Sequence, residues 1–155
     1  MSDPEIISAI SSNPALEGLN ESYLSAMAES ARLVTFSSGE MIGREGAEAD
    51  GFYILISGRA SLEVYTPDRG AMPVQTIGAK GILGWSWLIP PYKWRFDAKA
   101  LDEVKAVRID GRWLRDECEK DPAFGYRLLQ RITGVFVDRL IATRLQLLDI
   151  YGDVR

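Results

Sequence analysis

The sequence reads Gly51-Phe-Tyr-Ile-Leu-Ile-Ser-Gly58 near its centre, followed at once by Ala60-Ser-Leu-Glu-Val-Tyr65. The first run is continuously apolar and bounded by glycines, which is typical of a buried strand. The second run alternates, which is typical of a strand with one exposed face. From Leu33 to Ile109 short strand-like runs recur with Gly or Pro between them. This rhythm favours a mainly β architecture, a β-barrel or jelly roll, over a parallel sheet.

Helical patterns flank the strands on both sides. Apolar residues at helical spacing predict helices within residues 1–32, and Asp110 is a suitable N-cap for a helix that follows the last strand. Asp121-Pro122 predicts the start of a longer helix, because proline is tolerated in a first turn. One domain of 155 residues is therefore expected, with N-terminal helices (1–32), a β-barrel (33–109) and C-terminal helices (110–151).

Residues 78–100, here named the cassette, read GAKGILGWSWLIPPYKWRFDAKA. Three glycines precede a short apolar turn of helix from about Trp85 to Ile89. Because the first N–H groups of a helix have no partner inside it, such a loop can hold an anion. The hydroxyl of Ser86 and the N–H groups of Ser86 and Trp87 could add to that site. A plain structural turn, with Ser86 capping its own helix, is the alternative.

The upstream segment Gly39-Glu-Met-Ile-Gly-Arg-Glu-Gly46-Ala-Glu-Ala-Asp50, the strand Gly51–Gly58, the motif Gly81-Ile-Leu-Gly84 and the long final helix come in a specific order. In this order they resemble the cyclic nucleotide-binding domain superfamily, which includes the sensor modules of catabolite-activator-type transcription factors. The resemblance runs from about Ser22 to Tyr151. It implies a jelly-roll β-barrel flanked by N-terminal helices and a long C-terminal helix, and a regulatory rather than catalytic function.

In catabolite-activator relatives the long helix leads into a helix-turn-helix domain. This sequence ends at Arg155 and contains no helix-turn-helix pattern or basic stripe. We therefore expect a stand-alone sensor domain without the DNA-binding output.

In the superfamily the cassette carries a Glu after its glycine, which accepts the ribose 2′-hydroxyl, and an Arg that pairs with the cyclic phosphate. Gly84 matches that glycine, but Trp85 stands where the Glu would be. Counting forward from Gly84 places the arginine at Arg95, whereas counting back from Ala98-Lys-Ala100 places Trp94 there. The resemblance thus implies reduced or altered binding of cyclic AMP, cyclic GMP or another small anionic ligand. The candidate binding residues are Gly84, Trp85, Ser86, Trp87, Trp94 and Arg95.

Aromatic rings replace the missing polar groups of the cassette. Trp85, Trp87, Tyr92 and Trp94 fall within ten residues around Pro90-Pro91. Large rings with an N–H donor can stack on a flat ligand or anchor a protein partner. They can also fill the space that a ligand would have occupied. These three interpretations remain open at the level of the sequence.

The final helix carries an apolar seam, a set of residues that recur at steps of three and four. A seam of this length needs a partner, and both its spacing and the family resemblance favour a homodimer. Packing against the chain's own barrel is the alternative. The seam residues expected at the interface are Leu129, Ile132, Phe136, Leu140 and Leu147.

Composition limits the remaining functions. The formal net charge of −4 offers no global attraction to nucleic acid. Histidine is absent and Cys118 is the single cysteine, which excludes Ser-His or Cys-His catalysis and zinc or iron–sulfur ligation by these residues, so we expect no enzyme. Acidic neighbours should raise the thiol pKa of Cys118, so a packing role is expected. No apolar run reaches membrane-spanning length and no leader is evident, which predicts a cytoplasmic protein.

Overall fold

The computed structural model describes residues 3–152, except for the side chains of residues 143 and 146–152. In this range the helices are α1 (Pro4–Ser11), α2 (Glu21–Ser30), α3 (Gly111–Lys120) and α4 (Pro122–Gly152), with the 3-10 helices η1 (Pro14–Leu16) and η2 (Trp85–Leu88). The strands are β1 (Ala31–Phe36), β2 (Met41–Gly43), β3 (Gly51–Ser57), β4 (Ala60–Thr66), β5 (Gly70–Ile77), β6 (Ile82–Leu83), β7 (Asp97–Ala100) and β8 (Val104–Asp110).

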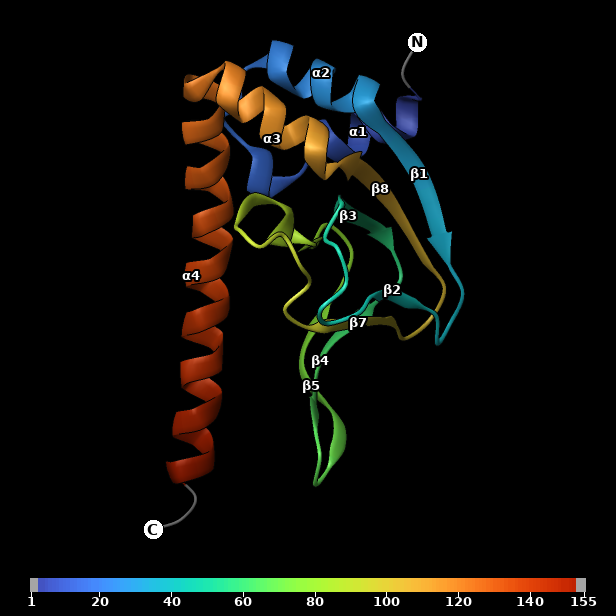
Figure 1. Ribbon diagram of the computed structural model, residues 1–155, viewed down its shortest axis with the longest axis vertical. Helices are drawn as coiled ribbons and strands as arrows, with labels where there is room; N and C mark the ends of the chain where they lie inside the picture. Colours follow the sequence, from blue (N-terminus) through green and yellow to red (C-terminus); the bar gives the residue numbers. More distant parts are fainter. Residues whose placement is uncertain (1–2, 153–155) are drawn as a thin grey trace.

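The strands form two four-stranded antiparallel sheets, with the orders β1-β8-β3-β6 and β2-β7-β4-β5. The hairpin of β4 and β5 projects away from the rest of the molecule, and α1, α2 and α3 gather at the opposite end (Figure 1). This arrangement confirms the predicted jelly-roll β-barrel flanked by N-terminal helices and a long C-terminal helix.

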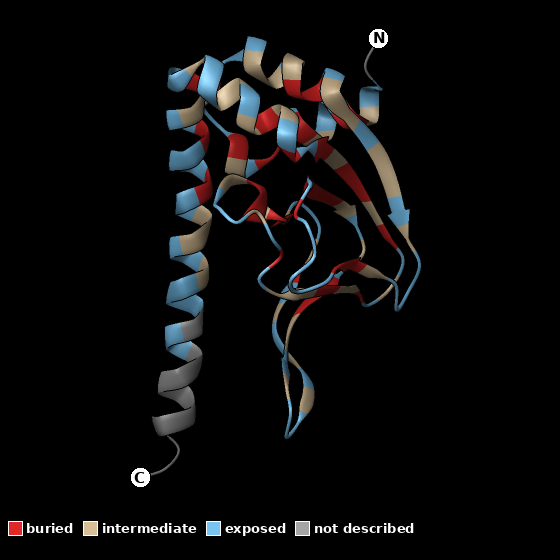
Figure 2. Ribbon diagram, viewed as in Figure 1, coloured by how far each residue is buried: buried red, intermediate tan, exposed pale blue. Residues whose placement is uncertain are grey.

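Strand β3 lies at the boundary between two apolar cores, which explains its continuous hydrophobicity. Phe52 and Ile54 face a cluster that the helices complete, whereas Tyr53 and Leu55 face the interior of the barrel. Successive side chains of a strand point to opposite faces, so both faces of this strand are buried. Figure 2 shows the buried residues gathered where the helices meet the sheet.

Short polar caps set the helix starts that the sequence predicted. The Asp110 carboxylate accepts hydrogen bonds from the N–H groups of Arg112 (2.8 Å) and Trp113 (3.1 Å) at the start of α3. At the start of α4 the Asp121 carboxylate accepts from the N–H of Phe124 (3.2 Å) and from the hydroxyl of Tyr23 (2.7 Å). The caps thereby satisfy N–H groups that have no partner inside the helix.

Helix α4 packs one side of its first half against its own chain and then continues past the barrel (Figure 1). Ile132 is fully buried in the core, and the Phe136 ring lies 4.9 Å from that of Trp85, centroid to centroid. The prediction that Ile132 contacts a second copy is therefore wrong, because it has no exposed surface. Leu129 and Leu140 are exposed, and the side chain of Leu147 lies outside the described residues.

No helix in residues 3–152 combines the length and the apolar content that crossing a membrane requires.

Candidate functional site

The cassette begins with a backbone turn that requires glycine. Gly84 adopts a left-handed conformation with φ +83°, and a Cβ atom there would lie 2.5 Å from the carbonyl oxygen of Gly51. The predicted apolar turn follows as η2, whose N-cap position is Gly84 and which has no side-chain cap. Ser86 lies inside this helix and is buried, so it does not have the capping role expected as the alternative.

Of the two candidates for the arginine position, Trp94 is buried and Arg95 is exposed. Trp94 is buried inside the barrel, where its ring lies 6.3 Å from that of Tyr53, centroid to centroid. Arg95 is exposed, donates a hydrogen bond to the carbonyl oxygen of Pro90 (3.2 Å) and lies 5.9 Å from the Trp85 ring centroid. The inward position between the two candidates is thus held by the indole.

The space left inside the cassette is about 10 Å³, which is room for about one water molecule. Five of the six predicted residues line it, and the exception is Trp87. Trp87 is fully buried on the helical side of the sheet, with its ring 5.9 Å from that of Phe52, centroid to centroid. The structure therefore brings together Gly84, Trp85, Ser86, Trp94 and Arg95.

Arg139 also lines this small cavity, although no sequence pattern pointed to it. It reaches the cassette from α4, and its Nη2 donates a hydrogen bond to the carbonyl oxygen of Ile82 at 2.5 Å. Burial lowers the pKa of the Arg139 guanidinium, although an arginine remains protonated at neutral pH. Arg139 is not one of the residues of the apolar seam of α4, so its spacing did not mark it as a contact residue. Its partner Ile82 lies 57 residues away in sequence, so no local motif could reveal the hydrogen bond.

Two helices fix the outer side of the cassette. Arg115 of α3 donates from Nη1 to the carbonyl oxygen of Trp87 (2.8 Å), and its Cζ lies 4.1 Å from the Tyr92 ring centroid. Phe136 of α4 contacts Trp85 edge to face. A change in the cassette would therefore act directly on α3 and α4.

A larger groove of about 480 Å³ lies outside the cassette, between α4 and the β4–β5 hairpin. Trp85 and Arg139 line both spaces. The groove is lined by Leu62, Val74, Gln75, Trp85, Phe96, Phe136, Arg139 and Leu140.

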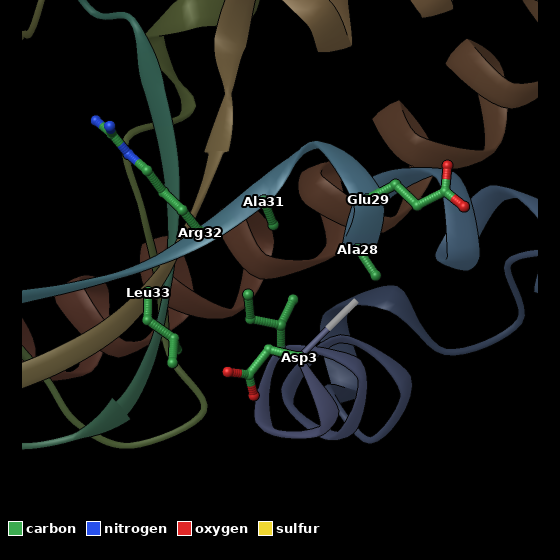
Figure 3. Close-up of a pocket in the computed structure, with 7 residues that line it drawn as sticks. Asp3, Ala28, Glu29, Ala31, Arg32 and Leu33 are labelled. Carbon is green, nitrogen blue, oxygen red and sulfur yellow. The ribbon is translucent and has the colours of Figure 1, made fainter. Parts of the chain in front are cut away.

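A separate hollow of about 450 Å³ lies between the start of α1 and the junction of α2 with β1. The charged ends of Glu29 and Arg32, which border it, point away from one another, and the Asp3 carboxylate lies at the start of α1 (Figure 3). Side chains that diverge in this way do not converge on one ligand group. Among the described residues, no group of three or more His, Cys, Asp or Glu could hold a metal ion.

Cys118 on α3 is half-buried. Burial, followed by the charges of Glu117 and Glu119, raises the pKa of its thiol to about 11. The direction agrees with the sequence expectation, but burial is the larger cause.

Comparison with known proteins gives a family and a fold. The sequence profile of the cyclic nucleotide-binding domain matches residues 33–121. A CRP-like cAMP-activated global transcriptional regulator of Mycobacterium tuberculosis is 28% identical over 139 residues, which cover 89% of this chain and 60% of the regulator. The chain thus spans less than two thirds of the curated relative that it matches.

Solved structures with a similar fold also belong to cyclic nucleotide-binding proteins. A proposed cyclic nucleotide-binding protein of Geobacter metallireducens GS-15 superposes with a TM-score of 0.78 at 26% identity, covering 90% of this chain and 99% of that one. A cyclic nucleotide-binding domain of Methylobacillus flagellatus superposes with a TM-score of 0.75 at 16% identity, covering 94% and 80%, and this second likeness shows the fold alone. The profile match covers more than half of the chain and includes the barrel and the cassette, so the chain belongs to the cyclic nucleotide-binding domain family.

Proposed function

We propose that this chain is a non-catalytic regulatory domain in which the cassette is closed by its own aromatic side chains and α4 responds to the state of the cassette. The observation that carries the proposal is the inward position of Trp94, which leaves about 10 Å³ of space beside Trp85 and Arg139. Binding of cyclic AMP or cyclic GMP is expected to be strongly reduced.

Both volume and charge support reduced binding. A cyclic nucleotide cannot enter a cavity the size of one water molecule unless Trp94 moves. Trp85 replaces the carboxylate that would accept the ribose hydroxyl, and the exposed Arg95 already donates to the carbonyl oxygen of Pro90. Losing charge-assisted partners costs a few kcal/mol, which corresponds to about two decades of affinity.

Helix α4 is the element that would transmit a change in the cassette to a partner. Phe136 and Arg139, one turn apart on this helix, contact Trp85 and the carbonyl oxygen of Ile82. Any ligand or partner that displaced Trp85 would disturb the Phe136 contact directly and would move a side chain that lines the same small cavity as Arg139. We infer that the position of α4 is the regulated quantity. Catalysis is not expected, because the sequence has no histidine and its single cysteine has a raised pKa.

Calorimetric titration with cyclic AMP and cyclic GMP tests the closed cassette. We expect no saturable binding at micromolar concentrations. The double variant Trp85→Glu/Trp94→Arg should gain cyclic AMP binding, because it opens the cavity and supplies both polar groups. Trp85→Leu/Trp94→Leu is the matched control, since it opens a similar space without the charges and should not gain binding.

Amide hydrogen exchange of α4 in the double variant tests whether α4 responds to a ligand in the cassette. Addition of cyclic AMP should change the exchange of amides near Phe136 and Arg139 while α1 stays unchanged. Micromolar binding by the wild-type protein would contradict the closed cassette. A binding-competent variant whose α4 exchange did not respond would contradict the regulatory proposal.

The alternative is a ligand-free dimeric interaction module. It is favoured by the exposed apolar side chains of α4, among them Leu129, Val137, Leu140 and Ile141. A dimer whose double variant gains no ligand would support this alternative.

A further inference from the structure

Strand β1 (Ala31–Phe36) has one open edge. Each of its six residues pairs with β8, and no strand in residues 3–152 lies on its other side. Figure 1 shows β1 at the outer border of the molecule. We propose that this open edge binds an extended segment of a partner protein as an added antiparallel strand, with basic side chains on the side of α1. The edge takes no part in the function proposed above, which concerns the cassette and α4.

The register of the sheet shows which backbone groups of β1 are free. The N–H of Gly111 donates to the carbonyl oxygen of Asp50 (2.9 Å), so the last pair of β8 with β3 is of the non-hydrogen-bonded kind. The two kinds of pair alternate along an antiparallel ladder, so the even-numbered residues of β8 bond to the even-numbered residues of β1. Leu33 and Thr35 therefore direct their N–H and C=O groups to the open edge, where no described group bonds to them.

The other outer strands of the two sheets are shorter or interrupted. Strand β5 contains Pro73, which has no N–H to donate, and β2 and β6 have three and two residues. Strand β1 contains no proline and pairs with β8 without a register shift. A regular open edge of this length is a template for pairing with another chain.

The side chains of β1 divide between two faces. Leu33 packs against the cluster that the helices complete, whereas Val34 and Phe36 pack against the interior of the barrel. In an antiparallel pair, residues that exchange hydrogen bonds have their side chains on the same face. The partner residues that bond to Leu33 and Thr35 therefore place their side chains on the side of α1, and the residues between them face the other way.

A hollow on the side of α1 determines which partner side chains fit. It has a volume of about 450 Å³, and the carboxylates of Asp3 and Glu29 border it. Arg32 is the one cation among the residues that line it, and its guanidinium points away from Asp3 (Figure 3). Opposite charges on neighbouring strands attract, so this face favours lysine or arginine in the partner strand. The other face, beside Val34, favours apolar residues.

Calorimetric titration of the full chain with the peptide acetyl-VKVKVKV-amide tests the proposal, because this peptide has lysine on one face and valine on the other. We expect saturable binding of one peptide per chain, and no binding of acetyl-VEVEVEV-amide. Methylation of the three lysine backbone nitrogens removes the donors that face β1 and should weaken binding at least about tenfold. Methylation of three valine backbone nitrogens, which face away from β1, is the matched control and should leave binding unchanged.

Variants of the chain test the same edge from the other side. Asp3→Asn keeps an acceptor for the N–H of Glu5, which the Asp3 carboxylate now caps (2.7 Å). It should weaken binding of the lysine peptide about two- to fivefold, the effect of one partly exposed ion pair. Asp68→Asn, at an exposed position in the β4–β5 turn, is its control and should have no effect.

Thr35→Pro removes an N–H that faces the open edge and leaves the ladder with β8 intact, so it should fold and lose peptide binding. If this variant does not fold, the methylated peptides and Asp3→Asn still decide the question. No saturable binding up to millimolar peptide, or equal loss from the two methylations, would overturn the proposal. A loss confined to valine methylation would overturn the antiparallel orientation, because a parallel strand bonds through the other set of residues. Equal binding of the lysine and glutamate peptides would overturn the charge preference.

Discussion

Gly84 is the residue on which the cassette geometry depends most directly. Its left-handed φ of +83° disfavours any L side chain, and a Cβ would lie 2.5 Å from the backbone oxygen of Gly51, an atom that cannot rotate away. We expect Gly84→Ala to lower the free energy of unfolding by about 2–5 kcal/mol, the sum of left-handed strain and overpacking. Urea unfolding followed by fluorescence measures the loss.

Gly39 provides the control for that prediction. Its φ is +88°, but no atom lies within 4 Å of a Cβ built there. Gly39→Ala should therefore show the conformational cost alone, about 1–2 kcal/mol. Equal losses for both variants would mean that the Gly51 oxygen moves aside and that the turn is not tightly held.

The sequence offered two ways to locate the arginine position, counting forward from Gly84 or backward from Ala98. The backward count, which gives Trp94, identifies the buried residue correctly. Ala98 and Ala100 of β7 are buried, and stepping back by two from Ala98 passes Phe96 and reaches Trp94, which is also buried. This count crosses only the bends at Arg95 and Phe96 and keeps the alternation of more and less buried positions. The forward count from Gly84 crosses η2 and Pro90-Pro91, where the alternation has no meaning. The approach of Arg139 could not be predicted, because it depends on how α4 packs.

At the scale of elements, the start of α4 is joined to α2 by the hydrogen bond from Tyr23 to Asp121 (2.7 Å). That bond, followed by the N–H of Phe124, holds the pKa of the Asp121 carboxyl below its ordinary value of 3.8. A depressed pKa stabilises the fold above the unfolded-state value, and the stabilisation is lost as the pH falls through the folded-state value. We expect Asp121→Asn to be less stable than wild type at neutral pH, with the difference shrinking at acidic pH.

Urea midpoints of both proteins between pH 7 and pH 2 measure this difference. Tyr23→Phe is the matched control, since it removes the donor and keeps the ring, which packs 4.6 Å from the Phe124 ring, centroid to centroid. It should show part of the same pH dependence. A difference between wild type and Asp121→Asn that did not vary with pH would mean that the carboxylate charge does not stabilise this helix start.

Helix starts were predictable because their signals are local, as with Asp110 and with Asp121-Pro122. The partner of an apolar seam is not a local property. Steps of three and four establish that one face of α4 is covered, but they do not distinguish its own barrel from a second copy. The structure divides the predicted seam: Ile132 is fully buried in its own core, whereas Leu140 is 62% exposed.

At the scale of the whole molecule, α4 stands along one side of the barrel and extends beyond it (Figure 1). With 31 residues it is about 46 Å long at 1.5 Å per residue. Several of its large apolar side chains are exposed, and we expect a helix that exposes so many of them to have a partner. These exposed residues are Tyr126, Leu129, Val137, Leu140, Ile141 and Leu145.

We expect this face of α4 to pair with a second copy, and Val137→Glu/Ile141→Glu to convert the dimer to a monomer in sedimentation velocity. Ala142→Glu, at an exposed position on another side of the helix, should remain dimeric. If the wild-type protein sedimented as a monomer at micromolar concentration, the expected pairing of α4 with a second copy would be wrong. Regulation would then have to act through another partner on the same face.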